Sequence, residues 1–80
     1  MINARVIVTL KNGVLDPQGK AIEGALHGLG FAGLSSARQG KVFDLVIDTD
    51  DREKAEADAA AMCEKLLANM VIENYVIELQ

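Results

Sequence analysis

The stretch Val14-Leu15-Asp16-Pro17-Gln18-Gly19-Lys20-Ala21 joins an alternating segment to a segment with one apolar face, and it holds the only proline. It predicts the start of a helix. Asp16 can accept hydrogen bonds from the free N–H groups of the first turn, and proline at the first helical position has no N–H to leave unpaired. The requirements of a helix start do not explain Gly19, because glycine costs on the order of 1 kcal/mol of helix stability relative to alanine inside a helix. Its bare backbone therefore indicates a use beyond helix stability.

Periodicity outside this stretch predicts four strands and a second helix. Strands are expected at 5–10, 34–39, 42–48 and 71–79, and the second of these is weak and polar. The turn between the second and third strands is assigned to Gly40-Lys41.

The first helix is expected over Pro17 to Leu29, and Gly30 follows it as a left-handed cap. One face carries an apolar stripe made of Ala21, Ile22, Ala25, Leu26 and Leu29. Gly24 and Gly28 each weaken this helix, so they indicate that another backbone comes close. The sequence leaves open whether that backbone belongs to a partner or to the chain's own sheet.

The second helix is expected to begin at Asp50, which forms a capping-box pattern with Glu53. Asn69 is a candidate cap at its other end. Its buried stripe is predicted to consist of Ala55, Ala59, Met62, Cys63 and Leu66.

This order, β-α-β-β-α-β, predicts a single α+β domain over residues 1–80. The expected architecture is a ferredoxin-like two-layer sandwich, with two helices on one face of a four-stranded antiparallel sheet. The other face of that sheet carries Ile7, Val46 and Val76, which is too aliphatic to be fully wet. It therefore predicts association.

Composition excludes several classes of protein. The formal net charge of −4 argues against nucleic acid, which needs a clustered basic face. No apolar run approaches the roughly 18 residues of a membrane span. The first residues lack the apolar core of a secretory signal, so a cytoplasmic location is expected.

The chain shows no catalytic constellation. It has one histidine, His27, and one cysteine, Cys63, and no Cys/His cluster with metal-ligand spacing. It also lacks a phosphate-binding glycine loop, and its predicted central strands carry aliphatic residues where RNA readers of this fold class carry aromatics. We therefore expect no catalytic, cofactor-binding or metal-binding residues, which leaves an interaction module.

Short stretches along nearly the whole chain carry a family resemblance: Val8-Thr9-Leu10-Lys11, Val14 to Ala21, Ala25-Leu26-His27, Arg38-Gln39-Gly40-Lys41, Met62 to Asn69, and Val71-Ile72-Glu73. They are similar to the PurS family, the small subunit of phosphoribosylformylglycinamidine (FGAM) synthase. Asp16-Pro17-Gln18-Gly19-Lys20 is the most specific of them. The chain departs from the family pattern at Met70, where proline is usual, and around Ser35-Ser36, so the extent of the second strand is open.

The resemblance implies a non-catalytic subunit of a glutamine-dependent, ATP-driven C–N ligase of purine biosynthesis. In this family the small subunit forms a homodimer or homotetramer. It bridges the large synthetase subunit, PurL, and the glutaminase subunit, PurQ, so that ammonia reaches the amidation site. ATP and magnesium belong to the synthetase subunit, and no nucleic acid or membrane partner is implied. The alternative is a regulatory module of ferredoxin-like type that binds a small molecule.

The matched positions predict two exposed interface patches. The first consists of Asp16, Pro17, Gly19 and Lys20, and the second of Arg38, Gly40 and Lys41. His27 is a further candidate, with a structural or interface role favoured over a catalytic one. The alternative explanation for both patches is turn geometry and solvated charge.

Overall fold

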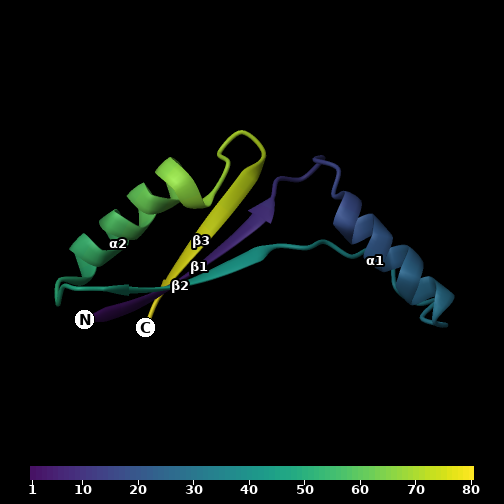
Figure 1. Cartoon of the computed structure of the whole chain (residues 1–80), viewed down its shortest axis with the longest axis horizontal. Helices are drawn as coiled ribbons and strands as arrows, with labels where there is room; N and C mark the ends of the chain where they lie inside the picture. The colour runs from purple at the N-terminus through teal and green to yellow at the C-terminus, as the bar shows by residue number, and fades with distance from the viewer.

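Three antiparallel strands form the centre of the computed structural model, which describes residues 1–80 (Figure 1). The elements in chain order are β1 (Ile2–Leu10), α1 (Pro17–Gly28), β2 (Lys41–Ile47), α2 (Arg52–Met62), the π-helical turn η1 (Cys63–Leu67) and β3 (Glu73–Leu79). The α+β class is therefore confirmed. Neither helix has the length and apolar composition needed to cross a bilayer.

The central strand β1 supplies most of the core. The strand order is β2-β1-β3, and Val6 lies opposite Phe43 on one side and Ile77 on the other. Alternate β1 side chains point toward α2, as the strand period requires. The buried residues on this face of the sheet, on α2 and on η1 are small or aliphatic: Ile2, Ala4, Val6, Val8, Ile47, Ala55, Ala59 and Cys63. The core is therefore one sheet face packed under one helix.

The predicted four-stranded sheet is wrong, because residues 34–39 form no strand. These residues run as an extended coil directly into β2, and Gly40 makes no hairpin turn. The reason lies in their hydrogen bonds. Carboxylates of Asp16 and Glu23 accept the backbone N–H groups of Gln39 and Ala37, so these two donors are paired with side chains at α1 and not with a neighbouring strand.

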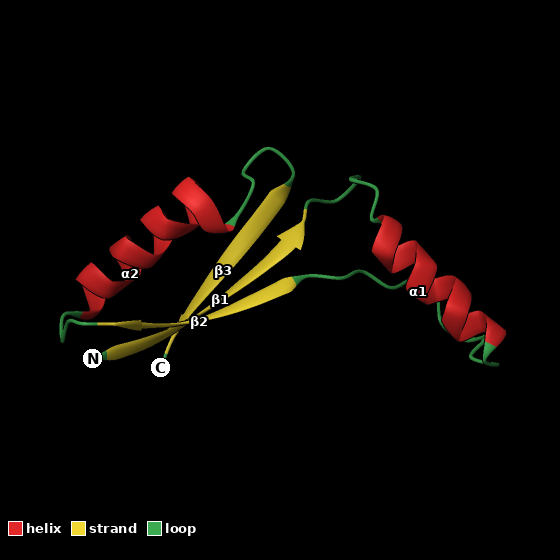
Figure 2. Cartoon of the chain, viewed as in Figure 1, coloured by secondary structure: helices red, strands yellow, loops and turns green.

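The predicted placement of both helices on one sheet face is also wrong. Only α2 covers the sheet, whereas α1 stands beyond its end (Figures 1 and 2). We call residues 12–40, which leave and re-enter the sheet around α1, the arm, and the remaining residues the sheet module. The molecule is accordingly elongated, with extents of 48 × 24 × 14 Å.

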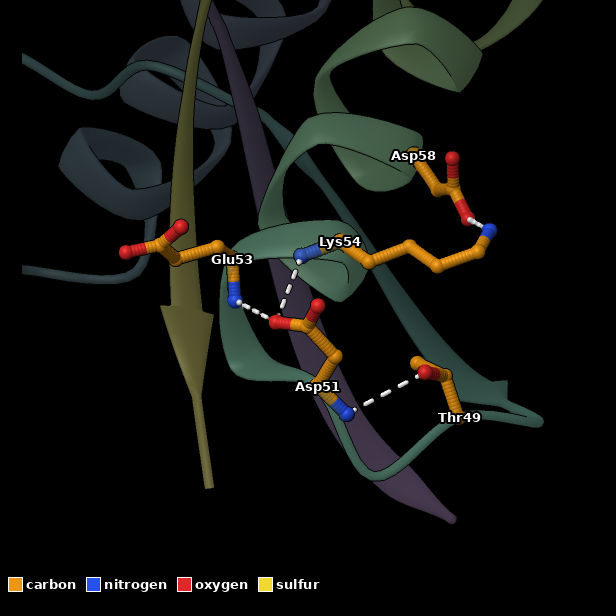
Figure 3. A network of polar contacts seen from close by, with 5 residues as sticks. All are labelled: Thr49, Asp51, Glu53, Lys54 and Asp58. Carbon is orange, nitrogen blue, oxygen red and sulfur yellow. Dashed lines mark hydrogen bonds and ion pairs between the residues drawn. The ribbon is translucent and has the colours of Figure 1, made fainter.

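The start of α2 differs by one residue from the prediction. Asp51 is the cap, and its side chain accepts from the N–H groups of Glu53 at 3.0 Å and Lys54 at 3.3 Å (Figure 3). Asp50 instead pairs with the N-terminal amine at 3.1 Å. Two adjacent aspartates both satisfy the sequence signal for a cap, and only the path of the chain out of β2 selects between them.

The C-terminal end of the second helix widens into a π turn. Within η1 the Ala68 N–H donates to the Cys63 carbonyl at 2.9 Å, and the Tyr75 hydroxyl donates to Glu64 at 2.9 Å. This bond raises the pKa of Tyr75, because the nearby carboxylate disfavours the phenolate. Asn69 does not cap the helix. Its side chain accepts from the Val71 N–H, within the turn that leads to β3.

Two members of the predicted buried stripe of α2 are exposed. Met62 is 41% exposed and Leu66 83% exposed, whereas Ala55, Ala59 and Cys63 are buried. The π turn and the absence of a second helix beside α2 leave these two large side chains without cover.

The sheet face opposite α2 carries the aliphatic residues that the sequence assigns to it. Val46 and Val76 are exposed, and Val76 lies opposite Ile7 across the ladder. Beside them Arg5 and Asp44 form an ion pair at 2.8 Å. The predicted position of these residues on the open face is confirmed, and their role in association stays a prediction.

Removing the correct cap is expected to destabilise α2. Asp51→Ala should lower the free energy of unfolding by about 1 kcal/mol, because two N–H groups of the first turn lose their acceptor. Asp50→Ala removes the same charge next to the cap and should have a clearly smaller effect. Urea denaturation followed by circular dichroism compares them, and a larger loss for Asp50→Ala would contradict this cap assignment.

Candidate interaction site at the root of the arm

The two predicted interface patches, some twenty residues apart in sequence, meet where the arm joins the sheet module. The outgoing limb, which leads from β1 into α1, brings Asp16 and Lys20 to this place. The returning limb, which leads from α1 to β2, brings Arg38 and Gly40. Asp16 borders two surface hollows at this place, one shared with Lys20 and Arg38 and the other with Gly40 and Lys41. The structure therefore joins the patches into one region, which we call the arm root.

The carboxylate of Asp16 ties the two limbs together. Its Oδ1 accepts from the Gly19 N–H at 2.9 Å, which caps α1 as predicted. Its Oδ2 accepts from the Gln39 N–H at 2.8 Å, across 23 residues of sequence. These bonds from Gln39 and Gly19 lower the pKa of Asp16, because they favour the charged form. One side chain thus starts the helix and holds the returning limb.

Gly19 has an internal reason to be glycine. It is buried, and a Cβ built on it would overlap the carbonyl oxygen of Ala37 and crowd the Asp16 carboxylate. The returning limb therefore passes directly over the first turn of α1. Gly40 has a similar role, since its Cβ would lie 2.7 Å from the Val8 carbonyl oxygen on β1. Both positions require a close approach of two backbone segments.

Two further side chains complete the root. Glu23 accepts from the Ala37 N–H at 3.1 Å, and Lys20 pairs with Glu23 at 3.7 Å. Arg38 donates to the carbonyl oxygens of Val14 at 3.1 Å and Lys11 at 3.3 Å. These bonds provide donors for two backbone acceptors of the turn around Gly13. The prediction omitted Glu23, although its helical spacing from Asp16 and Gly19 places all three on one face of α1.

The other predicted residues have mixed positions. Pro17 is the first residue of α1, as expected, and is exposed. Lys41 begins β2, where it pairs with Glu73 at 3.5 Å. His27 lies away from the root, near the far end of α1, where its Nε2 donates to the Leu34 carbonyl at 2.8 Å. Gly30 beyond it has a φ of +101°, which confirms the left-handed cap.

The charged side chains of the arm root serve mainly to hold its two limbs together. Its main hollow, about 360 Å³ in volume, is bordered by two basic and two acidic side chains, from Lys20, Arg38, Asp16 and Glu23. The acidic groups are committed to backbone N–H groups, and Arg38 to backbone carbonyls. No group of three or more His, Cys, Asp or Glu side chains in the molecule could hold a metal ion.

Comparison with known proteins identifies the family. The model of the PurS family, described as phosphoribosylformylglycinamidine (FGAM) synthase, matches residues 3–80. The chain belongs to the PurS family. It is 51% identical over 79 residues to the PurS subunit of FGAM synthase from Mycobacterium leprae, covering 96% of the chain and 94% of the relative. It is 44% identical over 80 residues to that of Bacillus subtilis, covering 100% of the chain and 94% of the relative.

Solved structures share the arm as well as the sheet. PurS of Methanocaldococcus jannaschii, described as a subunit of formylglycinamide ribonucleotide amidotransferase in purine biosynthesis, superposes with a TM-score of 0.90 at 40% identity. That match covers 100% of the chain and 96% of the other. A chain in the PurLQS structure of Thermotoga maritima superposes with a TM-score of 0.88 at 30% identity. That match covers 100% of this chain and 99% of the other. The chain is accordingly a subunit of FGAM synthase, an enzyme of purine biosynthesis.

Adding one methyl group at Gly19 is expected to loosen the arm root. Gly19→Ala forces the Ala37 carbonyl away and weakens the bonds that Asp16 makes to both limbs. We expect faster hydrogen exchange at Gln39 and at residue 19, measured by NMR. Gly33→Ala is the matched control, because a Cβ there meets nothing within 4 Å. Equal exchange rates in the two variants would rule out the close approach as the reason for Gly19.

Lowering the pH is expected to weaken the hydrogen bonds that the Asp16 carboxylate accepts at the arm root. Because the pKa of Asp16 is lowered in the fold, its contribution is complete above the ordinary pKa of about 3.9 and is lost as pH falls through the lower folded value. The amide shifts of Gly19 and Gln39, followed by NMR between about pH 6 and pH 2, should move together with a midpoint below 3.9. Asp16→Asn should abolish this step. A midpoint above the ordinary value would contradict the assignment.

Proposed function

We propose that this chain is a non-catalytic bridging subunit of FGAM synthase. It contacts the large synthetase subunit, PurL, and the glutaminase subunit, PurQ, and supports the transfer of ammonia between them. The overall reaction is the glutamine-dependent, ATP-dependent amidation of formylglycinamide ribonucleotide. ATP and magnesium are assigned to the synthetase subunit, and the assembly to the cytoplasm.

One observation carries this proposal: the chain is built as two bodies, the sheet module and the arm, joined at the arm root. The arm projects from the sheet module along the 48 Å length of the molecule, and the hydrogen bonds of Asp16, Glu23 and Arg38 hold its two limbs. A rod of this shape offers different surfaces at its two ends. Such surfaces suit a protein that touches two partners at once.

Exposed apolar side chains support the same conclusion. Leu15, Leu29 and Phe31 on the arm are 70%, 74% and 60% exposed, and Leu66 on the sheet module is 83% exposed. Large exposed apolar groups on a chain of 80 residues indicate surfaces that partners cover. The PurLQS structure from Thermotoga maritima, which contains a chain of this fold, supports a complex of three kinds of subunit.

Self-association belongs to the proposal as well. A chain of this length buries only roughly 60% of its unfolded surface, and this one has a single helix over its sheet. A homodimer or homotetramer would cover more of the apolar surface. We therefore propose that the bridging unit holds at least two copies of the chain.

Reconstitution with the synthetase and glutaminase subunits of the same organism tests the bridging function. We expect glutamine-dependent product formation to require this chain. Synthesis driven by added ammonium should proceed without it, because free ammonia needs no bridge. Full glutamine-dependent activity in its absence would overturn the proposal.

Reversing one charge at the arm root is expected to weaken assembly. Lys20 is well exposed and its pair with Glu23 is long, at 3.7 Å, so Lys20→Glu should leave the fold intact. We expect affinity for the synthetase subunit to fall roughly tenfold, since charges at the rim of an interface have effects of this size. Arg52→Glu, the same change at the start of α2, is the control. Unchanged assembly of the Lys20 variant in analytical ultracentrifugation would remove Lys20 from the interface.

A further inference from the structure

The segment that leads from β1 to α1 contains a tight turn at the arm root (Figure 1). The Val14 N–H donates to the Lys11 carbonyl at 3.2 Å, which closes a β-turn with Asn12 and Gly13 at its centre. Gly13 has a φ of +85°, whereas the φ of Asn12 is not positive. This combination is that of a type II turn, which requires a positive φ at its third residue. The turn geometry therefore explains why residue 13 is glycine.

Both ends of this turn are held by other parts of the chain. Arg38 Nη2 donates to the carbonyl oxygens of Lys11 at 3.3 Å and Val14 at 3.1 Å. The Lys11 N–H donates in turn to the Ile72 carbonyl at 2.8 Å. The two carbonyls that Arg38 bridges belong to the first and fourth residues of the turn. The length of chain between these residues therefore decides whether one guanidinium reaches both.

The centre of the turn, in contrast, has no hydrogen bonds. Asn12 and Gly13 are both exposed, and the Gly13 N–H has no acceptor within the chain. The Asn12 side chain makes no hydrogen bond either, whereas that of Asn69 accepts one from the Val71 N–H at 3.1 Å. Glycine also places no side chain beside its own nitrogen. The Asn12 amide group and the Gly13 nitrogen are therefore free to react with each other.

This pair of groups can remove the side-chain amide without an enzyme. The Gly13 nitrogen gives up its proton and attacks Cγ of Asn12, and the new N–C bond closes a succinimide ring. The Cγ–Nδ2 bond breaks, and the amide leaves as ammonia. Water then opens the ring at one of its two carbonyls, which leaves a carboxylate. Reactions of this kind make asparagine one of the chemically labile residues of proteins.

The carbonyl that water attacks determines the product. Attack at Cγ breaks the new N–C bond and leaves an ordinary aspartate. Attack at the backbone carbonyl of residue 12 breaks the original peptide bond and leaves isoaspartate, in which the chain runs through Cβ and Cγ. The isoaspartyl chain is therefore longer by one carbon–carbon bond, about 1.5 Å. Both products carry one more negative charge than the parent chain.

The other three asparagines do not have this arrangement. Asn3 and Asn74 lie inside β1 and β3, where strand pairing holds the backbone extended. The side chain of Asn69 is engaged by its hydrogen bond from Val71. The residues that follow these three asparagines all carry a Cβ next to the attacking nitrogen: Ala4, Met70 and Tyr75. They provide three internal controls within one chain.

We propose that Asn12 is a self-modifying site, at which the Gly13 nitrogen converts the side-chain amide to aspartate and isoaspartate. The isoaspartyl form uncouples the outgoing limb from Arg38, because the added bond separates the two carbonyls that one guanidinium now bridges. It also breaks the bond from Val14 to Lys11 that closes the turn. This inference goes beyond the proposed function and concerns the free chain.

Incubating the unaltered chain in buffer tests the modification. Peptide mapping by mass spectrometry should find a product heavier by about 1 Da at residue 12, and electron-transfer fragmentation should identify part of it as isoaspartate. The product should form faster in mildly alkaline than in mildly acidic buffer, because the attacking nitrogen must lose its proton. We expect conversion at Asn12 to be at least roughly tenfold faster than at any other asparagine. Equal rates at all four would overturn the proposal.

Asn12→Gln is the matched variant for this reaction. It keeps an amide on an exposed side chain and leaves Gly13 unchanged, so the fold should be preserved. The added methylene takes the amide carbon out of reach for the same ring closure. We expect the heavier product at residue 12 to be lost in this variant. Formation of that product at the parent rate would rule out attack by the Gly13 nitrogen.

Hydrogen exchange tests the effect on the arm root. The isoaspartyl chain, isolated by chromatography after incubation, is compared with freshly prepared Asn12→Asp, which has the same charge and an ordinary backbone. We expect the Val14 amide to exchange roughly tenfold faster in the isoaspartyl chain, because its bond to Lys11 is lost. The Lys54 amide, capped by Asp51 on α2, should exchange equally in both. Equal exchange at Val14 would overturn the uncoupling of the limb.

Discussion

The hydrogen bond from the Gln39 N–H to the Asp16 carboxylate, at 2.8 Å, is the constraint on which the architecture depends. It commits a backbone donor of the returning limb to a side chain, and Glu23 does the same for Ala37. Residues 34–39 form no strand, and these two backbone donors are paired with side chains at α1 instead of with a neighbouring strand. The limb instead runs straight into β2, and α1 stays off the sheet. The Asp16 carboxylate therefore both caps α1 and, together with Glu23, holds the returning limb against that helix.

The consequence is a domain with exposed apolar surface on both of its bodies. The sheet module has one helix over its three strands, and the arm carries a helix with exposed apolar side chains. Small domains have little stability to spare, so uncovered apolar surface on both bodies favours association. No group of three or more His, Cys, Asp or Glu side chains could hold a metal ion, and the PurS family to which the chain belongs is a subunit of a larger enzyme. The family therefore makes this chain one subunit of FGAM synthase.

Prediction from the sequence succeeded where the signal is local. Asp16 caps α1, Gly30 ends it with positive φ, and alternation places Val6 and Val8 inward and Val46 outward. It failed where two residues satisfy the same rule, as with Asp50 and Asp51, or where a signal is weak, as over residues 34–39. At the arm root it named Asp16, Gly19 and Arg38 in two separate patches, without the contacts that join them. Those contacts link residues more than twenty positions apart, and no local pattern encodes such a pairing.

The sequence alone determined the family, the helix and strand segments other than the strand expected over 34–39, and the inward and outward faces of the strands. These follow from residue type and short-range spacing, which act within one element. Only the tertiary structure decided that α1 leaves the sheet, that Gly19 serves the chain's own Ala37, and that Met62 and Leu66 stand uncovered. A periodic apolar face shows that a helix must pack, and it carries no information on what it packs against. Here that choice was made by two carboxylates and the backbone N–H groups they accept.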